Sequence, residues 1–117
     1  MRYIVTGGAG FIGSHIVEEL TQHNHEIVIF DNLSPGKREN IQPFLDTKNV
    51  EFVKGSITDL ALLKEIFEGA DGIFHEAAIV SVPRSVEYPM ENHEINLSGT
   101  LNVLVAARDC GVRKVVF

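Results

Sequence analysis

The 117-residue sequence predicts an α/β fold built on a doubly wound parallel sheet. Three observations lead to this prediction. Short apolar runs alternate with longer helical patterns, which implies parallel strands joined by right-handed crossover helices. The strand candidates are almost continuously hydrophobic, as expected of strands that are covered on both faces. A glycine cluster separates the first strand from the first helix, where the chain must turn tightly.

The predicted strands are short runs rich in β-branched or aromatic residues. They cover residues 3–5, 26–30, 50–53, 72–74 and 114–117. A polar stretch with Pro and Gly residues follows the second strand and is the longest irregular connection. The sequence does not decide whether part of this stretch is helical. Because the sequence stops at the fifth strand, we expect the fold to be truncated there.

Helical periodicity fills the longer segments between the strands. Apolar residues recur every four positions over 12–20, and at i, i+3 and i+7 over 60–67, where Asp59 precedes the run as an N-cap. A longer helix starts near Glu87 or Met90. Its apolar positions fall on several faces, so we expect it to be buried on more than one side.

Composition excludes several classes of function. Lysine plus arginine total 10 against 16 acidic residues, a net charge of −6, which argues against binding nucleic acid or an anionic membrane surface. The single cysteine, Cys110, excludes an internal disulfide and a thiolate zinc site. His23 and His25 favour a solvated turn over a metal site, so no metal is predicted. With no apolar run of about 20 residues and no signal peptide, we expect a cytoplasmic protein without a membrane span.

The glycine cluster reads Thr-Gly-Gly-Ala-Gly-Phe-Ile-Gly over residues 6–13. Gly7 permits the tight turn after the strand, Gly10 lets backbone approach a pyrophosphate, and Gly13 lets the helix pack closely on the sheet. The free N–H groups of the first helical turn and the positive end of the helix dipole would hold the phosphate charge. The position of the cluster between a strand and a helix predicts a dinucleotide site.

An acidic residue ends the second strand. Asp31 lies about 20 positions after the glycine cluster, where a carboxylate can bind both ribose hydroxyls. Its charge would repel a 2′-phosphate, which favours NAD over NADP, although Lys37 and Arg38 could weaken that preference. The alternative is that Asp31, with Asn32, only opens a turn.

Four ordered motifs extend this pattern over nearly the whole chain. They lie at residues 6–14, 31–34, 74–78 and 96–100. Together they resemble the extended short-chain dehydrogenases/reductases of the nucleotide-sugar epimerase/dehydratase group. The resemblance implies a Rossmann-type sheet of strand order 3-2-1-4-5 that binds NAD.

The same resemblance implies a role for each matching residue. Backbone N–H groups would bind the pyrophosphate, and a carboxylate and an amide would bind the adenosine ribose. Small side chains would lie beside the adenine, and closely approaching backbone would line the nicotinamide ribose. The implied cofactor-binding residues are Gly7, Gly10, Phe11, Ile12, Asp31, Asn32, Ser34, Gly36, Ser56, Ile57, Ala77, Ala78, Ile79, Val80 and Asn96. His75 is interpreted as a hydrogen-bonded core residue rather than a catalytic base. Glu76 stands where relatives commonly carry an apolar or amide residue.

The catalytic pair of that family, Tyr-x-x-x-Lys, has no counterpart in this sequence. The tyrosines are Tyr3 and Tyr88, and the residues four positions after them are Gly7 and Asn92. We therefore predict no catalytic residue. Residues 1–117 are interpreted as an NAD-binding domain that lacks the catalytic and sugar-binding parts.

Pro83 before Arg84 is closer to UDP-sugar 4-epimerases and related decarboxylases than to dehydratases. The predicted function is therefore the NAD-binding portion of a nucleotide-sugar 4-epimerase of the UDP-glucose/UDP-galactose type, with a UDP-sugar as substrate of the full enzyme. The alternatives are a 4,6-dehydratase or reductase of the same family, or a non-catalytic NAD-binding fragment. A homodimer through the helix after residue 90 is a further possibility.

Overall fold

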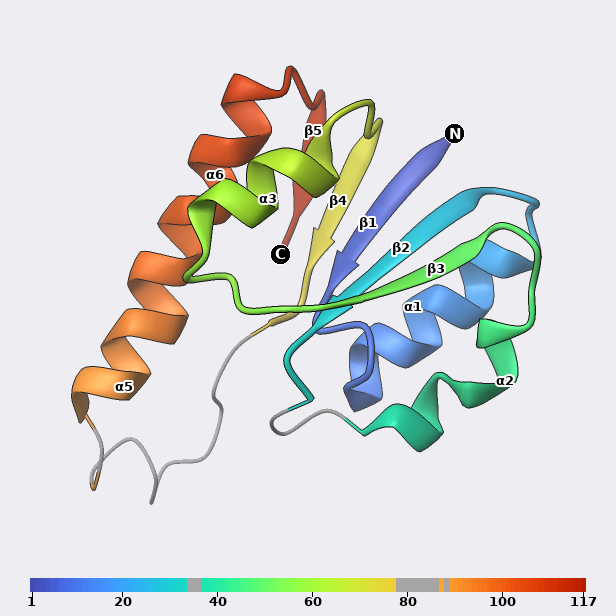
Figure 1. The fold of residues 1–117 in the computed structure, drawn as a ribbon, viewed down its shortest axis with the longest axis horizontal. Coiled ribbons are helices and arrows are strands. Elements are labelled where there is room, and N and C mark those ends of the chain that lie inside the picture. Colours follow the sequence, from blue (N-terminus) through green and yellow to red (C-terminus); the bar gives the residue numbers. More distant parts are fainter. Residues whose placement is uncertain (34–36, 78–86, 88) are drawn as a thin grey trace.

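A five-stranded parallel sheet forms the centre of the molecule (Figure 1). The structure, a computed structural model, describes residues 1–33, 37–77, 87 and 89–117. The strands are β1 (Arg2–Thr6), β2 (Glu26–Asp31), β3 (Val50–Lys54), β4 (Gly72–His75) and β5 (Lys114–Val116). Their order, β3-β2-β1-β4-β5, and their parallel pairing confirm the predicted sheet.

Helices connect successive strands and cover both faces of this sheet. They are α1 (Phe11–Thr21), α2 (Gln42–Leu45), α3 (Leu60–Phe67), α5 (Pro89–His93) and α6 (Gly99–Asp109). The polar connection after β2 contains α2 and a 3₁₀ turn, η1 (Arg38–Asn40). Between α5 and α6 the chain winds into a π-helical turn, η2 (Glu94–Ser98), so the single long helix expected there is divided. No helix in the described part of the chain has the length and hydrophobicity required to span a membrane.

Two of the helix ends follow the rules used on the sequence. The Asp59 side chain caps α3 by accepting a hydrogen bond from the N–H of Leu62 at 3.1 Å, which confirms the predicted N-cap. After α6, Gly111 adopts a φ of +71°, a conformation that favours glycine and ends the helix.

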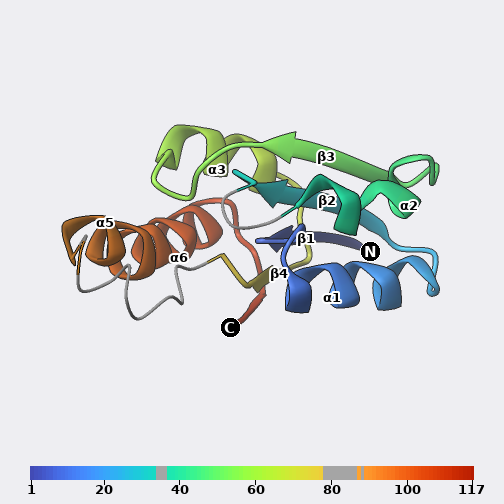
Figure 2. The ribbon, with the colours of Figure 1, turned by 90° about the horizontal axis from the view of Figure 1, so that it is seen from below.

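Alternating strand residues build two separate hydrophobic cores. On one face Ile4 and Val28 pack with buried residues of α3 and α6. On the other face Val5 and Ile29 pack with Val17 of α1, which Figure 2 shows running along the sheet. Burial of both faces explains why the strands are almost continuously apolar.

The face of α6 directed away from the sheet is exposed. Val103, Ala106 and Ala107 are buried against the core, whereas Leu97 of η2 is 60% exposed and Leu101 of α6 is 59% exposed. The expectation that this helix is buried on more than one side is therefore wrong. The sheet and α3 cover only one of its faces, and no described element covers the other.

Strand register brings three strand ends to one edge of the sheet. Thr6, the last residue of β1, pairs with Phe30 on β2 and with His75 on β4. The strand order reverses between β1 and β4, because β2 lies on one side of β1 and β4 on the other. The crevice outside the carboxyl ends at such a reversal is where open α/β sheets bind ligands.

Candidate functional site

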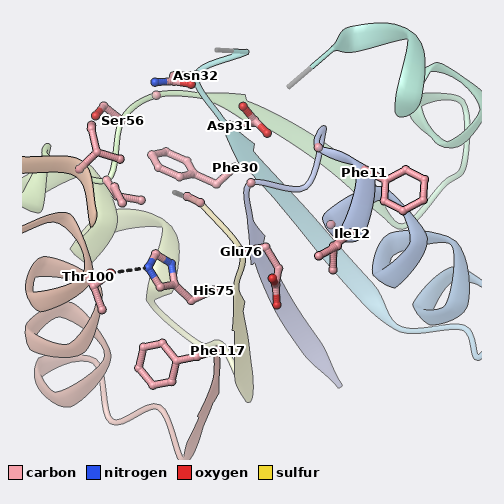
Figure 3. Close-up of a pocket in the computed structure, with 17 residues that line it drawn as sticks. Phe11, Ile12, Phe30, Asp31, Asn32, Ser56, His75, Glu76, Thr100 and Phe117 are labelled. Atoms are coloured by element: carbon pink, nitrogen blue, oxygen red, sulfur yellow. Dashed lines mark hydrogen bonds between the residues drawn. The ribbon is translucent and has the colours of Figure 1, made fainter. Parts of the chain in front are cut away.

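A crevice of about 500 Å³ opens at this reversal point (Figure 3). That volume lies within the range of small-molecule sites in proteins. Its walls come from the loop between β1 and α1, from the end of β2, from the segment after β3, and from the end of β4 facing α6. The lining residues are Gly7, Gly10, Phe11, Ile12, Gly13, Phe30, Asp31, Asn32, Gly55, Ser56, Ile57, His75, Glu76, Ala77, Ile95, Thr100 and Phe117.

The glycine loop forms a tight turn between β1 and α1. Gly7 has a φ of +69°, donates its N–H to the carbonyl of Phe30 at 2.7 Å, and accepts the N–H of Gly10 at 3.0 Å. A Cβ on Gly7 would come within 2.7 Å of the backbone of Glu76 and Ala77, at the end of β4. Glycine at this position therefore permits both the turn and the contact between the loop and β4.

The other two glycines serve different purposes. A Cβ on Gly13 would collide with the Gly7 carbonyl, so Gly13 permits the close approach of α1 to the loop. Among the described residues, a Cβ on Gly10 would meet the Gly7 oxygen at 3.3 Å, a tight contact but not a collision, and Gly10 has an ordinary extended backbone. Position 10 is therefore less restricted than position 13 by the described part of the protein. A ligand that lies against this backbone would restrict it further.

The N-terminus of α1 faces the crevice without a side-chain cap, because Gly10 occupies the N-cap position. The first N–H groups of a helix have no acceptor within the helix. The side chains of Phe11 and Ile12 are 79% and 60% exposed and lie at the crevice, so Ile12 is not a core residue of α1. Uncapped amides at a helix N-terminus suit a phosphate group, and this wall therefore fits a diphosphate.

Asp31 is buried and its carboxylate holds the loop in place. One oxygen accepts the N–H of Ala9 at 2.9 Å, and the other accepts the N–H of Leu33 at 2.7 Å. Leu33 has a φ of +63°, an uncommon conformation for leucine, which this short hydrogen bond stabilises. Each carboxylate oxygen keeps a further lone pair for a ligand hydroxyl.

The carbonyl of Ala9 is also held by hydrogen bonds. It accepts the N–H of Lys37 at 3.0 Å and the Nδ2 of Asn40 at 2.8 Å. The N–H of Ala9 is therefore bonded to the last residue of β2, and its carbonyl to the segment that follows β2. The nearby Arg38 guanidinium lies 5.5 Å from the centroid of the Phe52 ring, which occupies it in a cation–π contact.

A hydrogen-bonded chain forms the opposite side of the crevice. The Thr6 hydroxyl lies 2.6 Å from His75 Nδ1, and His75 Nε2 lies 2.9 Å from the Thr100 hydroxyl. That hydroxyl in turn donates to the Asn96 carbonyl at 2.9 Å. We call Thr6, His75, Thr100 and the Asn96 carbonyl the histidine relay. His75 is thus a buried, hydrogen-bonded residue, as its position in the sequence suggested.

Two titratable side chains near the relay have shifted pKa values. Burial lowers the pKa of His75 to about 4, so its imidazole is neutral at physiological pH. Burial also raises the pKa of Glu76, whose side chain lies on the α1 side of the crevice near Ile12 (Figure 3). The ring of Phe117 meets the His75 ring edge-on, with centroids 5.9 Å apart.

The structure brings together most of the described residues that the sequence assigned to a cofactor. Nine of them line the crevice: Gly7, Gly10, Phe11, Ile12, Asp31, Asn32, Ser56, Ile57 and Ala77. Asn96 is not among the lining residues, and its carbonyl accepts the bond from Thr100. Ser34, Gly36, Ala78, Ile79 and Val80 lie outside the described residues, as do Pro83 and Arg84.

Several lining residues were not assigned to the crevice from the sequence. Phe30, Ile95 and Phe117 read as core residues because only their hydrophobicity is visible. Thr100 lies within a recognised motif, but its partner His75 is 25 residues away. Among the residues the structure describes, no group of three His, Cys, Asp or Glu side chains could hold a metal ion.

Known proteins resemble the chain over almost its whole length. The model of the NAD dependent epimerase/dehydratase family matches residues 3–117. A putative UDP-glucose 4-epimerase of Methanocaldococcus jannaschii is 43% identical over 115 residues, which cover 97% of this chain and 36% of that protein. The chain thus spans about a third of the length of the curated relatives it matches first.

Two solved structures have the same fold. The NAD complex of a UDP-glucose 4-epimerase from Thermus thermophilus has a TM-score of 0.87 and 45% identity, covering 100% of this chain and 37% of that chain. A dTDP-glucose 4,6-dehydratase from Streptomyces venezuelae, with NAD bound, has a TM-score of 0.92 and 39% identity, covering 98% of this chain and 38% of that chain. With the family match over residues 3–117, these similarities show that the chain belongs to the NAD-dependent epimerase/dehydratase family, whose cofactor is NAD.

Proposed function

We propose that this chain is the NAD-binding portion of a nucleotide-sugar 4-epimerase that acts on a UDP-sugar. One observation carries the proposal: an uncapped helix N-terminus and a buried carboxylate face the same crevice, at the reversal point of the sheet. The similarity to UDP-glucose 4-epimerases supports the choice of reaction within the family.

The lining residues supply groups suited to each part of the dinucleotide. The amides of Phe11 and Ile12 bind the diphosphate, and the carboxylate of Asp31 accepts bonds from the adenosine ribose hydroxyls. Ser56 and Ile57 lie after β3, on the side that an adenine would occupy. We propose that the same cofactor is also bound by Asn32, Ser34, Gly36, Asn96 and residues 77–80.

When bound, NAD would supply a reversible hydride acceptor for carbon 4 of the sugar. The residues of this chain bind and orient the cofactor for that reaction. The chain has no Tyr-x-x-x-Lys pair, so the acid–base step is not assigned to it. The UDP-sugar is proposed as substrate of a full enzyme that includes such a pair.

Calorimetric titration of the chain with NAD and with NADP tests the cofactor assignment. We expect NAD to bind and NADP to bind more weakly, because the carboxylate of Asp31 repels a 2′-phosphate. Absence of NAD binding would refute the assignment. Turnover of UDP-glucose by the chain alone would refute the statement that it lacks the acid–base machinery.

The second candidate is a nucleotide-sugar 4,6-dehydratase. The structural similarity to the Streptomyces venezuelae dehydratase, at a TM-score of 0.92, favours it. Both reactions use the same cofactor site, so NAD binding does not separate them. Assaying a longer protein that contains this chain with UDP-glucose and with dTDP-glucose would separate them, since loss of water occurs only in the dehydratase reaction.

We also propose a homodimer through the exposed face of η2 and α6. Leu97, Leu101 and Leu104 recur at helical spacing on this face, and all are exposed. Exposed apolar residues in a continuous row are typical of an interface. Sedimentation of the chain measures its mass directly. A monomer at high concentration, or a dimer unchanged by Leu101→Glu, would contradict the proposal.

A further inference from the structure

The Thr6 hydroxyl is the centre of several contacts in the histidine relay. It accepts the N–H of Ala77 at 3.3 Å and that of Glu76 at 3.1 Å, in addition to its 2.6 Å contact with His75 Nδ1. The Glu76 N–H is shared, because it also donates to the Thr6 carbonyl at 3.0 Å. The peptide N–H groups at the end of β4 are therefore attached to β1. That segment of β4 is also the one that lies against Gly7.

Counting protons assigns one tautomer to His75. The Thr100 hydroxyl has one proton, which it donates to the Asn96 carbonyl, so it must accept from a protonated His75 Nε2. Nδ1 is then the unprotonated nitrogen and accepts the Thr6 proton. Every contact in the relay is satisfied by this arrangement.

The other forms of the imidazole leave contacts unsatisfied. With the proton on Nδ1, the Thr100 proton would be required by both Nε2 and the Asn96 carbonyl. With both nitrogens protonated, the Thr6 hydroxyl would face three N–H donors and its own proton would lose its acceptor. A buried polar proton without an acceptor is costly.

We propose that His75 is a positioning residue of the dinucleotide site: as the neutral Nε2–H tautomer, it orients the Thr6 hydroxyl so that this oxygen fixes the N–H groups of Glu76 and Ala77 beside the glycine loop. This inference rests on the proposed function, because the segment it fixes forms one wall of the proposed NAD crevice. His75 acts on that wall through Thr6 and takes no part in hydride or proton transfer.

The charged and titratable groups around the ring are few among the described residues. Glu76 follows His75, the last residue of β4, but its side chain lies on the α1 side of the crevice. From β1, α6 and the residue after β5, the ring meets Thr6, Thr100 and Phe117. Asp31 lies at the end of β2 in the same crevice. The two groups bonded to the imidazole are thus hydroxyls, which can each donate or accept.

The tautomer is tested first, on the unaltered chain without ligand. Long-range ¹H–¹⁵N correlation spectra report which nitrogen of His75 carries the proton, and the His75→Asn variant assigns its signals. We expect a single Nε2–H form at pH 7. A mixture of tautomers, or an Nδ1–H form, would overturn the proposal whether or not the chain binds NAD.

Three substitutions at position 75 then separate the contact with Thr6 from the contact with Thr100. His75→Leu removes both contacts and should weaken NAD binding about tenfold, which corresponds to the loss of roughly one hydrogen bond. His75→Asn places an amide oxygen where Nδ1 lies and should recover most of that loss. His75→Gln reaches toward Thr100 but offers no acceptor to Thr6, and should recover little. Equal affinities for the Asn and Gln variants would overturn the role of Thr6.

Amide hydrogen exchange supplies a readout that needs no NAD. Exchange at Ala77 should be faster in His75→Gln than in His75→Asn, since only the latter keeps the Thr6 contact. Exchange at Glu76 should differ less, because its N–H also donates to the Thr6 carbonyl. His23→Asn, at an exposed position away from the crevice, is the matched control and should change neither affinity nor exchange. If the chain binds no NAD but the tautomer and exchange results hold, the proposed function fails while the positioning role stands.

Discussion

The two sides of the crevice are built in different ways. The glycine loop and Asp31 form a wall from one β-α-β unit, whose key contact joins residues only 22 positions apart. The histidine relay joins β1, β4 and α6 through contacts that span up to 69 positions. The first wall is determined by backbone conformation and local spacing. The second depends on side chains that meet only after the sheet has formed.

Substitution of Gly13 should have the largest effect on stability. In Gly13→Ala the new Cβ would collide with the backbone of Gly7, and backbone cannot move away as a side chain could. We expect a loss of about 3 kcal/mol or more in the free energy of unfolding, measured with urea.

Gly10→Ala is the matched variant, because among the described atoms its Cβ would meet the Gly7 oxygen at 3.3 Å without colliding. It should lose much less stability than Gly13→Ala, yet bind NAD at least about tenfold more weakly than the unaltered chain. If both variants were equally stable, the distinction between a structural and a ligand-facing glycine would be wrong.

The pH dependence of stability tests whether His75 is neutral in the folded chain. Because burial lowers the pKa of His75 to about 4, the unfolded chain binds a proton between pH 6.5 and 4 that the folded chain does not. This residue should therefore reduce the free energy of unfolding as the pH falls through that range, by at most about 3 kcal/mol.

Glu76 has the opposite effect on the pH dependence of stability. Because its pKa is raised in the folded chain, the folded chain binds a proton more readily than the unfolded chain, and this residue increases the free energy of unfolding as the pH falls. Urea denaturation at several pH values, compared between the chain and His75→Asn, isolates the histidine contribution. Identical pH dependences would show that His75 is not held neutral by folding.

Removing the carboxylate of Asp31 tests the wall formed by the glycine loop and Asp31. Asp31→Ala should weaken NAD binding by about 1–3 kcal/mol, roughly 5- to 150-fold, if the proposed charge-assisted bonds to the ribose are lost. The variant should also be less stable, since the N–H groups of Ala9 and Leu33 lose their acceptor. Calorimetry and urea denaturation measure the two effects. Glu39→Ala, at an exposed acid nearby, is the control, and an unchanged affinity in Asp31→Ala would contradict the ribose assignment.

The smallest effect is expected at the outer end of the relay. Thr100→Val leaves the buried Nε2–H of His75 without its acceptor, at a cost of about 1 kcal/mol in the free energy of unfolding. Thr100→Ser keeps the hydroxyl and should cost less. Thr6→Val should exceed both, because it removes the acceptor of the Ala77 N–H, one of the two acceptors of the Glu76 N–H, and the donor to His75 Nδ1. Equal losses for Thr6→Val and Thr100→Val would show that the relay is not centred on Thr6.

The sequence predicted what depends on local spacing. The cap at Asp59 and the shared crevice of Gly10 and Asp31 follow from turn chemistry and motif spacing. The strand order followed from the family resemblance. The bonds from Asp31 to Ala9 and Leu33 were not predicted, because a carboxylate suited to a ribose and one suited to a loop look alike in a sequence.

Three features required the three-dimensional structure. The π-helical turn at 94–98 has no periodicity of its own within an apolar helical stretch, so one helix was expected in its place. The exposure of Leu101 was missed because hydrophobicity alone does not say which side of a helix the sheet covers. The partners of His75 could not be predicted either, since they lie on two other elements.

The double attachment of Ala9 has a consequence for the kinetics of association. Its N–H and its carbonyl are both bonded to groups of the protein itself, so this part of the loop does not depend on a dinucleotide for its order. Association then carries little conformational entropy cost at this wall, and no slow rearrangement has to precede it. Capture of the diphosphate is expected in a single kinetic phase, with a rate proportional to ligand concentration.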